Sequence, residues 1–205
     1  MPRIPRGGCA LCQEPSVAQD RPLCALCAGR RSPLDACIAG VWFTDEPAAW
    51  IRRYKYPPRG LQAQSGQDRA RLRALLAEST SWRPLAPPDC VVPVPLHAAR
   101  LRRRGFNPAT ALARSLAREI GAPLAHAALA RLRDTPTQTG LGRAARRANV
   151  RGAFRVRRLD AATVWLVDDV VTTGATLEEC ARVLRAAGVC RVVALCAART
   201  PPREA

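Results

Sequence analysis

The chain has 205 residues, which is enough for one hydrophobic core and a small accessory module. Its formal charge is +17, and residues 97–158 hold 15 arginines against Glu119 and Asp134, a net +13. No run of 18 apolar residues occurs, and the amino terminus lacks the apolar segment of a signal peptide, so we expect a protein that is not exported and has no membrane span. The local excess of arginine favours a polyanionic partner, although a solvated arginine-rich surface would give the same composition.

Two Cys-x-x-Cys pairs lie near the amino end, and their members are Cys9, Cys12, Cys24 and Cys27. Four thiolates form the usual ligand set of a structural zinc ion and leave no open coordination position for catalysis. We therefore predict a zinc module over residues 1–37, which could hardly fold without its metal. Free thiols and a redox pair are the alternatives, and Cys37 is a candidate substitute ligand.

Residues 38–83 are predicted to connect this module to the rest of the chain. The pattern of apolar residues predicts a strand over 38–44 and amphipathic helices over 46–56 and 69–79. Lys55 is the only lysine of the chain and lies between two tyrosines. It could contact a phosphate or a base, but a packed helix end is an equally good interpretation.

A second predicted strand, over residues 90–94, leads into an arginine-rich loop and then into a helix over 108–120. Arginine side chains suit the oxygens of a polyphosphate, so this loop is a candidate anion site. The residues that we assign to it are Pro95, Leu96, His97, Arg100 and Arg104.

Residues 131–158 are predicted to form a long, polar, arginine-rich loop. Such a loop could close over a bound anion or lie along a nucleic-acid backbone. The arginines that we assign to nucleic-acid contact, in this loop and before it, are Arg102, Arg103, Arg133, Arg143, Arg146 and Arg147.

The carboxyl third of the chain predicts a β-α-β unit. Residues 164–167 predict a strand buried on both faces, and residues 192–196 predict the next parallel strand. Thr176 and Glu179 predict a capping box at the start of the intervening helix, which Gly188 ends. The loop between the first strand and the helix therefore lies at the carboxyl edge of the sheet, where open α/β sheets bind their ligands.

The chemistry of that loop suits a sugar phosphate. Asp168 and Asp169 can accept hydrogen bonds from sugar hydroxyls and can hold Mg²⁺ through water. A helix N-terminus binds phosphate through its free amides, and threonine hydroxyls add donors. We assign phosphate binding to Thr172, Thr173, Gly174, Ala175 and Thr176. A strand–turn–helix with two capping carboxylates and no ligand is the alternative.

Residues 167–176, with the sequence VDDVVTTGAT, closely resemble the phosphoribosyl pyrophosphate (PRPP) motif of type I phosphoribosyltransferases. The resemblance implies that Asp168 and Asp169 bind the ribose hydroxyls, with Mg²⁺ accompanying PRPP. It implies that residues 172–176 bind the 5-phosphate and that the loop after residue 94 receives the pyrophosphate.

Three further segments, VPVPLH at 92–97, RGFN at 104–107 and TPTQTGL at 135–141, resemble the signature of the ComF family. The cysteine module and the PRPP motif also match that family in order, so the resemblance covers essentially the whole chain. One departure is Pro108, where many relatives have Gln.

The resemblance implies an α/β fold: a type I phosphoribosyltransferase-like parallel sheet flanked by helices, with a small four-cysteine zinc module. We expect the module at 1–37, a connecting, hood-like region at 38–83, the main domain at 84–200 and a tail at 201–205. A ComF-like protein is expected to act in natural transformation by handling incoming single-stranded DNA, with competence or recombination proteins as candidate partners. The alternatives are an active phosphoribosyltransferase of unknown acceptor and a regulatory module that senses PRPP, so catalysis stays open.

Overall fold

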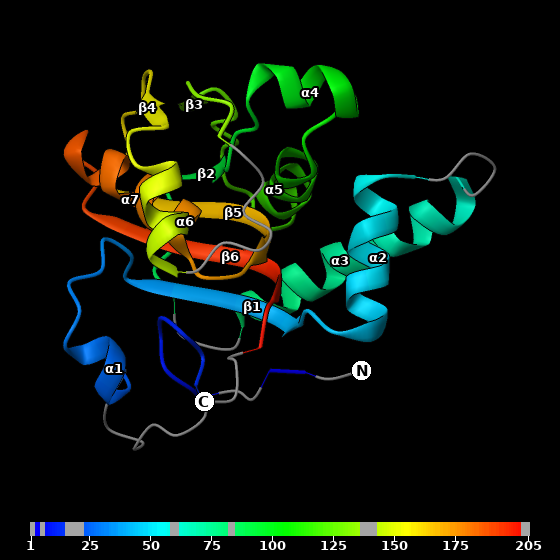
Figure 1. The fold of residues 1–205 in the computed structure, drawn as a ribbon, viewed down its shortest axis with the longest axis horizontal. Helices are drawn as coiled ribbons and strands as arrows, with labels where there is room; N and C mark the ends of the chain where they lie inside the picture. The colour runs from blue at the N-terminus through cyan, green and yellow to red at the C-terminus, as the bar shows by residue number, and fades with distance from the viewer. Residues whose placement is uncertain are drawn as a thin grey trace.

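Four parallel strands form the centre of the molecule, in the order β1-β6-β5-β2 (Figure 1). The computed structural model describes residues 3–4, 7–14, 23–57, 62–81, 85–135 and 143–201, with the side chains of residues 62–65 and 143 left out. The strands of the sheet are β1 (Ala36–Trp42), β2 (Cys90–Pro93), β5 (Thr163–Val171) and β6 (Arg191–Arg199). Because every neighbouring pair in this sheet is parallel, the predicted fold class is confirmed.

Helices cover both faces of the sheet (Figure 1). Helix α7 (Ala175–Ala186) lies on one face, next to α6 (Arg143–Val150) and the antiparallel pair β3 (Leu129–Arg131) and β4 (Phe154–Val156). The remaining helices are α1 (Ala25–Ala28), α2 (Asp45–Lys55), α3 (Gln62–Thr80), α4 (Ala98–Arg104) and α5 (Pro108–Glu119). Of these, α3 and α5 pack on the other face, with α2 against α3.

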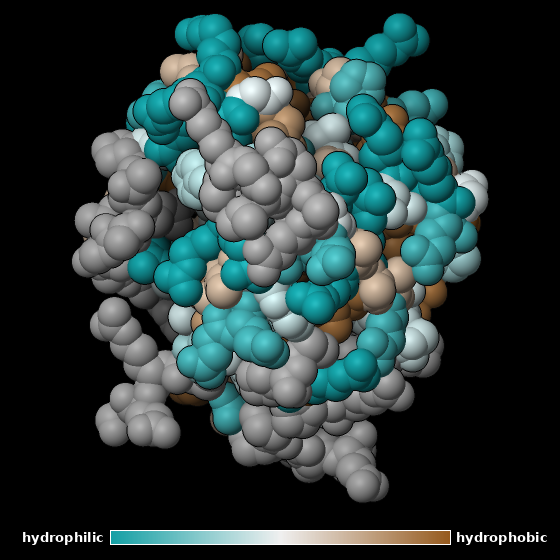
Figure 2. Space-filling view, turned by 90° about the vertical axis from the view of Figure 1, so that its right-hand side faces the viewer, coloured by the Kyte–Doolittle hydropathy of each residue, from teal (hydrophilic) through white to brown (hydrophobic). Residues whose placement is uncertain are grey.

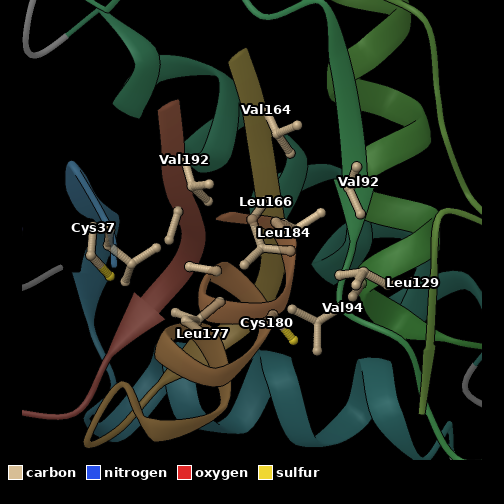
Figure 3. Close-up of a cluster of buried hydrophobic side chains, with 14 of the residues drawn as sticks. Cys37, Val92, Val94, Leu129, Val164, Leu166, Leu177, Cys180, Leu184 and Val192 are labelled. Atoms are coloured by element: carbon tan, nitrogen blue, oxygen red, sulfur yellow. The ribbon is translucent and has the colours of Figure 1, made fainter. Parts of the chain in front are cut away.

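Strand β5 has apolar side chains on both faces because both faces are covered. Leu166 lies next to Leu184 of α7 in Figure 3, and Val164 belongs to the same buried cluster. Trp165 and Val167, which alternate with them, pack on the side of α3 and α5. The continuous apolar run of a buried parallel strand is therefore confirmed. Truncating a fully buried leucine of this core to alanine would cost about 2–5 kcal/mol of folding free energy.

Strand β1 begins in the range predicted as the zinc module and continues into the predicted connecting region; it is an edge strand of the sheet and pairs with β6. The amino-terminal segment covers its outer edge: the amide of Cys37 donates to the carbonyl of Ala10 at 2.7 Å. The side chain of Gln13 continues this pairing by accepting from the amide of Ala39 and donating to its carbonyl. The predicted domain boundaries stay predictions.

Four local predictions are wrong. The arginine-rich segment after β2 is not a loop throughout, because residues 98–104 form helix α4. Strand β5 continues through Asp168 and Asp169 to Val171, because pairing with β6 extends to that point. Helix α7 begins at Ala175 with Gly174 as its N-cap, so there is no capping box at Thr176. Residues 131–158 are not one long loop, since they contain the end of β3, helix α6 and strand β4, while residues 136–142 lie outside the described residues.

Glu179, predicted to belong to the capping box, has a different role. Its carboxylate accepts from the amide of Gly152 at 2.7 Å and pairs with Arg182 at 2.7 Å. It therefore fixes the segment between α6 and β4 on α7. These partners lower the pKa of Glu179, with the hydrogen bond from Arg182 as the largest cause.

The surface on the side of α2 and α3 is mainly hydrophilic (Figure 2). Apolar residues show only in small patches there, between charged and polar side chains. Among the described helices, none combines the length and the hydropathy needed to cross a lipid bilayer.

Candidate functional site: a cavity at the carboxyl edge of the sheet

A cavity of about 390 Å³ opens where β5 and the loop after β2 end. It brings together the two loops that the sequence analysis assigned to phosphates, although they are about 75 residues apart in the chain. Its polar and charged lining residues are Lys55, Arg100, Arg104, Asn107, Arg131, Asp168, Asp169, Thr172 and Thr176. The arrangement is that of a sheet edge at which β2 and β5 are neighbours, so their following loops converge.

The two aspartates both line this cavity but belong to opposite faces of β5. The alternation of the strand puts Asp168 on the face of Leu166 and Asp169 on the face of Val167. Asp169 is only 7% exposed, and its Oδ2 lies 2.9 Å from Nζ of Lys55 at the end of α2. Asp168 accepts a hydrogen bond at 2.9 Å from the amide of Asp169.

Burial and the neighbouring Asp169 raise the pKa of Asp168 to about 7. Lys55 and Arg131 act in the opposite direction but do not outweigh them. For Lys55, burial disfavours the ammonium form, yet the charge of Asp169 raises its pKa. Burial, followed by repulsion from Arg100, lowers the pKa of Arg131. The cavity therefore holds a pair of carboxylates that the protein's own cations neutralise only in part.

The predicted phosphate loop leads from β5 into the first turn of α7. Gly174 has φ of +81°, in the left-handed region that side chains with a Cβ rarely adopt, and it caps the helix. The first amides of a helix have no acceptor within the helix, and the cavity lies in front of them. Thr172, Ala175 and Thr176 line the cavity as well, whereas Thr173 does not: its Oγ1 is buried without a hydrogen-bond partner among the described residues, and the residue lines a separate hollow. This end of α7 can therefore hold an anion through backbone and hydroxyl donors.

The predicted anion loop supplies Pro95, Leu96, Arg100 and Arg104 to the cavity. Arg100 pairs with Asp134 at 2.9 Å and donates to the carbonyl of Thr135. His97 is not a lining residue: it caps α4, where its Nδ1 accepts from the amide of Ala99 at 3.3 Å.

Arg104 reaches the cavity at the end of α4. It donates to the hydroxyl of Tyr56 at 2.7 Å, and its guanidinium carbon lies 4.8 Å from the centre of that ring. The tyrosine ring is 64% exposed. Arg104 is thus held in place by an exposed aromatic residue at the mouth of the cavity, with donors left for a ligand.

The arginines predicted to contact nucleic acid do not form one group. Arg102 and Arg103 are exposed on α4, while Arg146 and Arg147 lie on α6. Arg147 pairs with Glu178 at 3.1 Å, and Arg133 donates to the carbonyl of Arg151. Nothing is described of the side chain of Arg143.

Sequence analysis missed two residues of the cavity. Asn107 caps α5 through the amide of Ala109 and donates to the carbonyl of Val94, which ties the anion loop to that helix. Arg131 belongs to β3, a short strand within a stretch predicted as loop. The pattern Asn-Pro at the start of a predicted helix could have identified Asn107 as a cap, whereas no local signal marks Arg131.

The four predicted metal ligands come together. The Sγ atoms of Cys9, Cys12, Cys24 and Cys27 all lie within 4.8 Å of one another, and those of Cys12 and Cys24 are 3.6 Å apart. A zinc ion with four sulfur ligands at about 2.3 Å requires sulfur–sulfur separations of about 3.8 Å, so the donor set fits structural zinc. Cys37 is not part of this group, because Arg199 donates to its sulfur at 3.0 Å.

Comparison with known proteins agrees with this geometry. The phosphoribosyl transferase domain model matches residues 101–204, a range that contains β5, the aspartate pair and α7. Competence protein F of Haemophilus influenzae is 32% identical over 173 residues, which are 81% of this chain and 73% of that protein. DNA utilization protein YhgH of Salmonella typhi and that of Escherichia coli are each 31% identical over 193 residues, 94% of this chain and 84% of theirs.

Proposed function

This chain belongs to the ComF family of proteins with a phosphoribosyltransferase domain, and we propose that its cavity binds PRPP together with Mg²⁺. One observation carries the proposal: Asp168 and Asp169, the start of α7, and Arg100 and Arg104 all line the same cavity. A ligand with a diol and with phosphates at both ends matches this combination of acceptors and donors.

Each part of PRPP has a partner in this arrangement. The carboxylates accept hydrogen bonds from the ribose hydroxyls, and the amides of residues 174–176 donate to the 5-phosphate. Arg100 and Arg104 donate to the pyrophosphate. Mg²⁺ would be held through the carboxylates and the pyrophosphate oxygens, and it would neutralise the charge that gathers there. Burial and repulsion from Asp169, which raise the pKa of Asp168 to about 7, favour a divalent cation next to the two carboxylates.

Calorimetry with Mg²⁺ and PRPP tests this proposal. The double change Asp168→Asn and Asp169→Asn removes charge-assisted hydrogen bonds and should weaken binding about 100-fold or more. The matched control is Asp160→Asn, an exposed carboxylate shortly before β5, which should bind as the unchanged protein does. Equal affinities for the double variant and the control would contradict the site.

Single-stranded DNA is the second ligand that we propose, consistent with a cytoplasmic role in natural transformation. The names competence protein F and DNA utilization protein belong to relatives that match most of this chain. Arg102 and Arg103 are exposed on α4, next to Arg104 at the mouth of the cavity. Tyr56 offers an exposed ring on which a base can stack.

Titration of a dT oligonucleotide at several salt concentrations tests this second proposal. Each phosphate contact contributes about 0.7 to the slope of log affinity against log salt, so changing Arg102 and Arg103 to alanine should reduce that slope by about 1.4. Arg114 and Arg118 are exposed on α5 and provide the matched double control. An affinity that does not change between about 50 and 200 mM salt would exclude binding through the DNA backbone.

Two uses of bound PRPP remain to be distinguished. A transferase would release pyrophosphate when a suitable acceptor is added, with charge on the leaving group stabilised by Arg100, Arg104 and Mg²⁺. A PRPP sensor would instead change its affinity for a competence or recombination protein when PRPP is added. Pyrophosphate release and pull-down, both measured with and without PRPP, separate these two activities.

A further inference from the structure

The cysteine module and the phosphate loop lie next to each other, although the sequence separates them by about 135 residues. A hollow of about 180 Å³ lies between them. Leu11, Cys12 and Cys27 line it from the module, and residues 172–174 line it from the loop. The module therefore forms the outer wall of the loop that we assign to the 5-phosphate.

Arg199 makes the first connection between the two parts. It is the last residue of β6, is 7% exposed and donates to the carbonyl of Leu11 at 3.0 Å and to Oε1 of Gln13 at 3.1 Å. Leu11 lies between Cys9 and Cys12, so the hydrogen bond to its carbonyl reaches the first Cys-x-x-Cys pair. In the sheet, Arg199 is in register with Val171, after which the phosphate loop begins.

Gln13 strengthens this connection because it is itself fixed. Its side chain is buried and forms hydrogen bonds of 2.8 and 3.1 Å with the backbone of Ala39 in β1. Its φ of 60° lies in the left-handed region that residues other than glycine rarely adopt. The turn that follows Cys12 is thus held in an unusual conformation against the edge of the sheet.

Arg30 makes a second connection, three residues after Cys27. Its Nη2 lies 3.3 Å from Oε1 of Glu178, which belongs to the first turn of α7. The amide of Glu178 donates to the carbonyl of Gly174, at 2.8 Å. The second Cys-x-x-Cys pair is therefore linked to the first turn of α7, whereas the first pair is linked to the end of β6, beside the residue that precedes the phosphate loop.

We propose that the metal-bound module positions the phosphate loop, with Arg199 and Arg30 as the positioning residues. Four thiolates on one ion fix the two Cys-x-x-Cys pairs relative to each other, and the two arginines transmit that arrangement to residues 172–178. The zinc module is then a part of the ligand site and not only a separate structural unit. This inference rests on the proposed binding of PRPP at that loop. Because coupling between the affinities of two ligands is reciprocal, bound PRPP should also raise the affinity for zinc.

Amide hydrogen exchange of residues 172–178, measured before and after zinc is removed with a chelator, tests the coupling directly. We expect exchange of these amides to rise about tenfold, while the amides of α5 keep their protection. In the same samples, the affinity for PRPP with Mg²⁺ should fall about tenfold. Unchanged exchange and unchanged affinity after zinc removal would overturn the inference.

Two variants keep the test valid if zinc removal unfolds the whole chain. Arg199→Lys keeps the charge but loses the planar set of donors, and Arg30→Ala removes the contact with Glu178. With zinc content shown to be full, we expect exchange at residues 172–178 to rise about tenfold for Arg199→Lys and about threefold for Arg30→Ala. Arg191→Ala, at the exposed opposite end of β6, is the control.

The outcomes for the two proposals are separate. If the zinc-bound protein does not bind PRPP, the proposed function fails, and hydrogen exchange still decides whether module and loop are coupled. If PRPP binds equally well to the protein and to both variants, and exchange at residues 172–178 is the same in all three, the function stands and the coupling is refuted.

Discussion

Carboxylates occur at both ends of the central strands, and their surroundings differ sharply. At the amino end, Asp89 is exposed and accepts from the amides of Ala162 and Thr163, each at 2.8 Å. Asp35 is exposed as well, and accepts from Val192 and Arg185, each at 2.7 Å. These acidic residues complete the starts of strands β5 and β6.

At the carboxyl end, the acidic residues are less exposed and have fewer partners that are described. Asp168 accepts one backbone bond, and Asp169 pairs with Lys55. Burial and mutual repulsion raise the pKa of Asp168 to about 7. The exposed carboxylates at the amino end therefore stabilise the fold, whereas the ionised form of Asp168 at the carboxyl end destabilises it. A ligand that supplies hydroxyls and a divalent cation would offset that loss of folding stability.

The largest expected effect is on stability after Asp168→Asn. A carboxyl group with a pKa of 3.8 when unfolded and about 7 when folded opposes folding above pH 3.8, and the penalty is complete above pH 7. Its size is at most about 4 kcal/mol at pH 8. Urea denaturation should show Asp168→Asn to be more stable than the unchanged protein at pH 8, with little difference near pH 4. A variant that is equally or less stable at pH 8 would contradict the comparison.

Removal of a carboxylate at the amino end of the strands should lower the stability of the protein instead of raising it. Asp89→Ala removes the acceptor of the amides of Ala162 and Thr163, which are exposed to water, and should destabilise the protein by about 0.5–1.5 kcal/mol. Its affinity for PRPP should stay within about twofold of the unchanged protein, because it is far from the ligand site along β5. Denaturation and calorimetry on the same sample check both statements. Weakened ligand binding by Asp89→Ala would remove the distinction between the two ends.

The smallest expected effect concerns Lys55. The ammonium group of Lys55 lies 2.9 Å from Asp169 and lowers the pKa of Asp168. The substitution Lys55→Met removes this cation. The pKa of Asp168 should therefore rise by about one unit. Carbon-13 NMR of labelled aspartate can follow the carboxyl group through its titration. Arg52→Met, an exposed cation on the same helix, is the control that should leave it unchanged.

Much of the core unit around the site follows from local sequence. The apolar run at 164–167, the loop of Thr and Gly and the amphipathic helix after it predict β5, α7 and β6 correctly in type and order. The end of β5 could not be predicted in this way, because aspartate disfavours strands and only pairing with β6 overrides that preference. The sequence predicted an N-cap at Thr176 from its hydroxyl, but the helix begins after Gly174, whose positive φ ends the turn and whose cap involves no side-chain hydrogen bond.

The sequence made Lys55 a candidate for contact with a phosphate or a base, but it could not specify the partner Asp169, because tertiary structure forms that contact. Lys55 reaches Asp169 from the end of α2, more than 100 residues earlier in the chain, and Arg131 comes from a three-residue strand. Neither contact leaves a periodic or local signal. Helix α6 is different, because its alanines and arginines are good helix formers. The neighbouring Thr and Gly residues outweighed that signal in the sequence analysis.

The most direct measurement is the titration of the Asp168 carboxyl group by carbon-13 NMR, with and without Mg²⁺ and PRPP. In the free protein we expect a midpoint near pH 7. Hydrogen bonds from ribose hydroxyls favour the ionised carboxylate, so binding should lower the midpoint by about 2–3 pH units. A midpoint near pH 4 in the free protein, or one that does not move when the ligand binds, would contradict the role given to this end of the sheet.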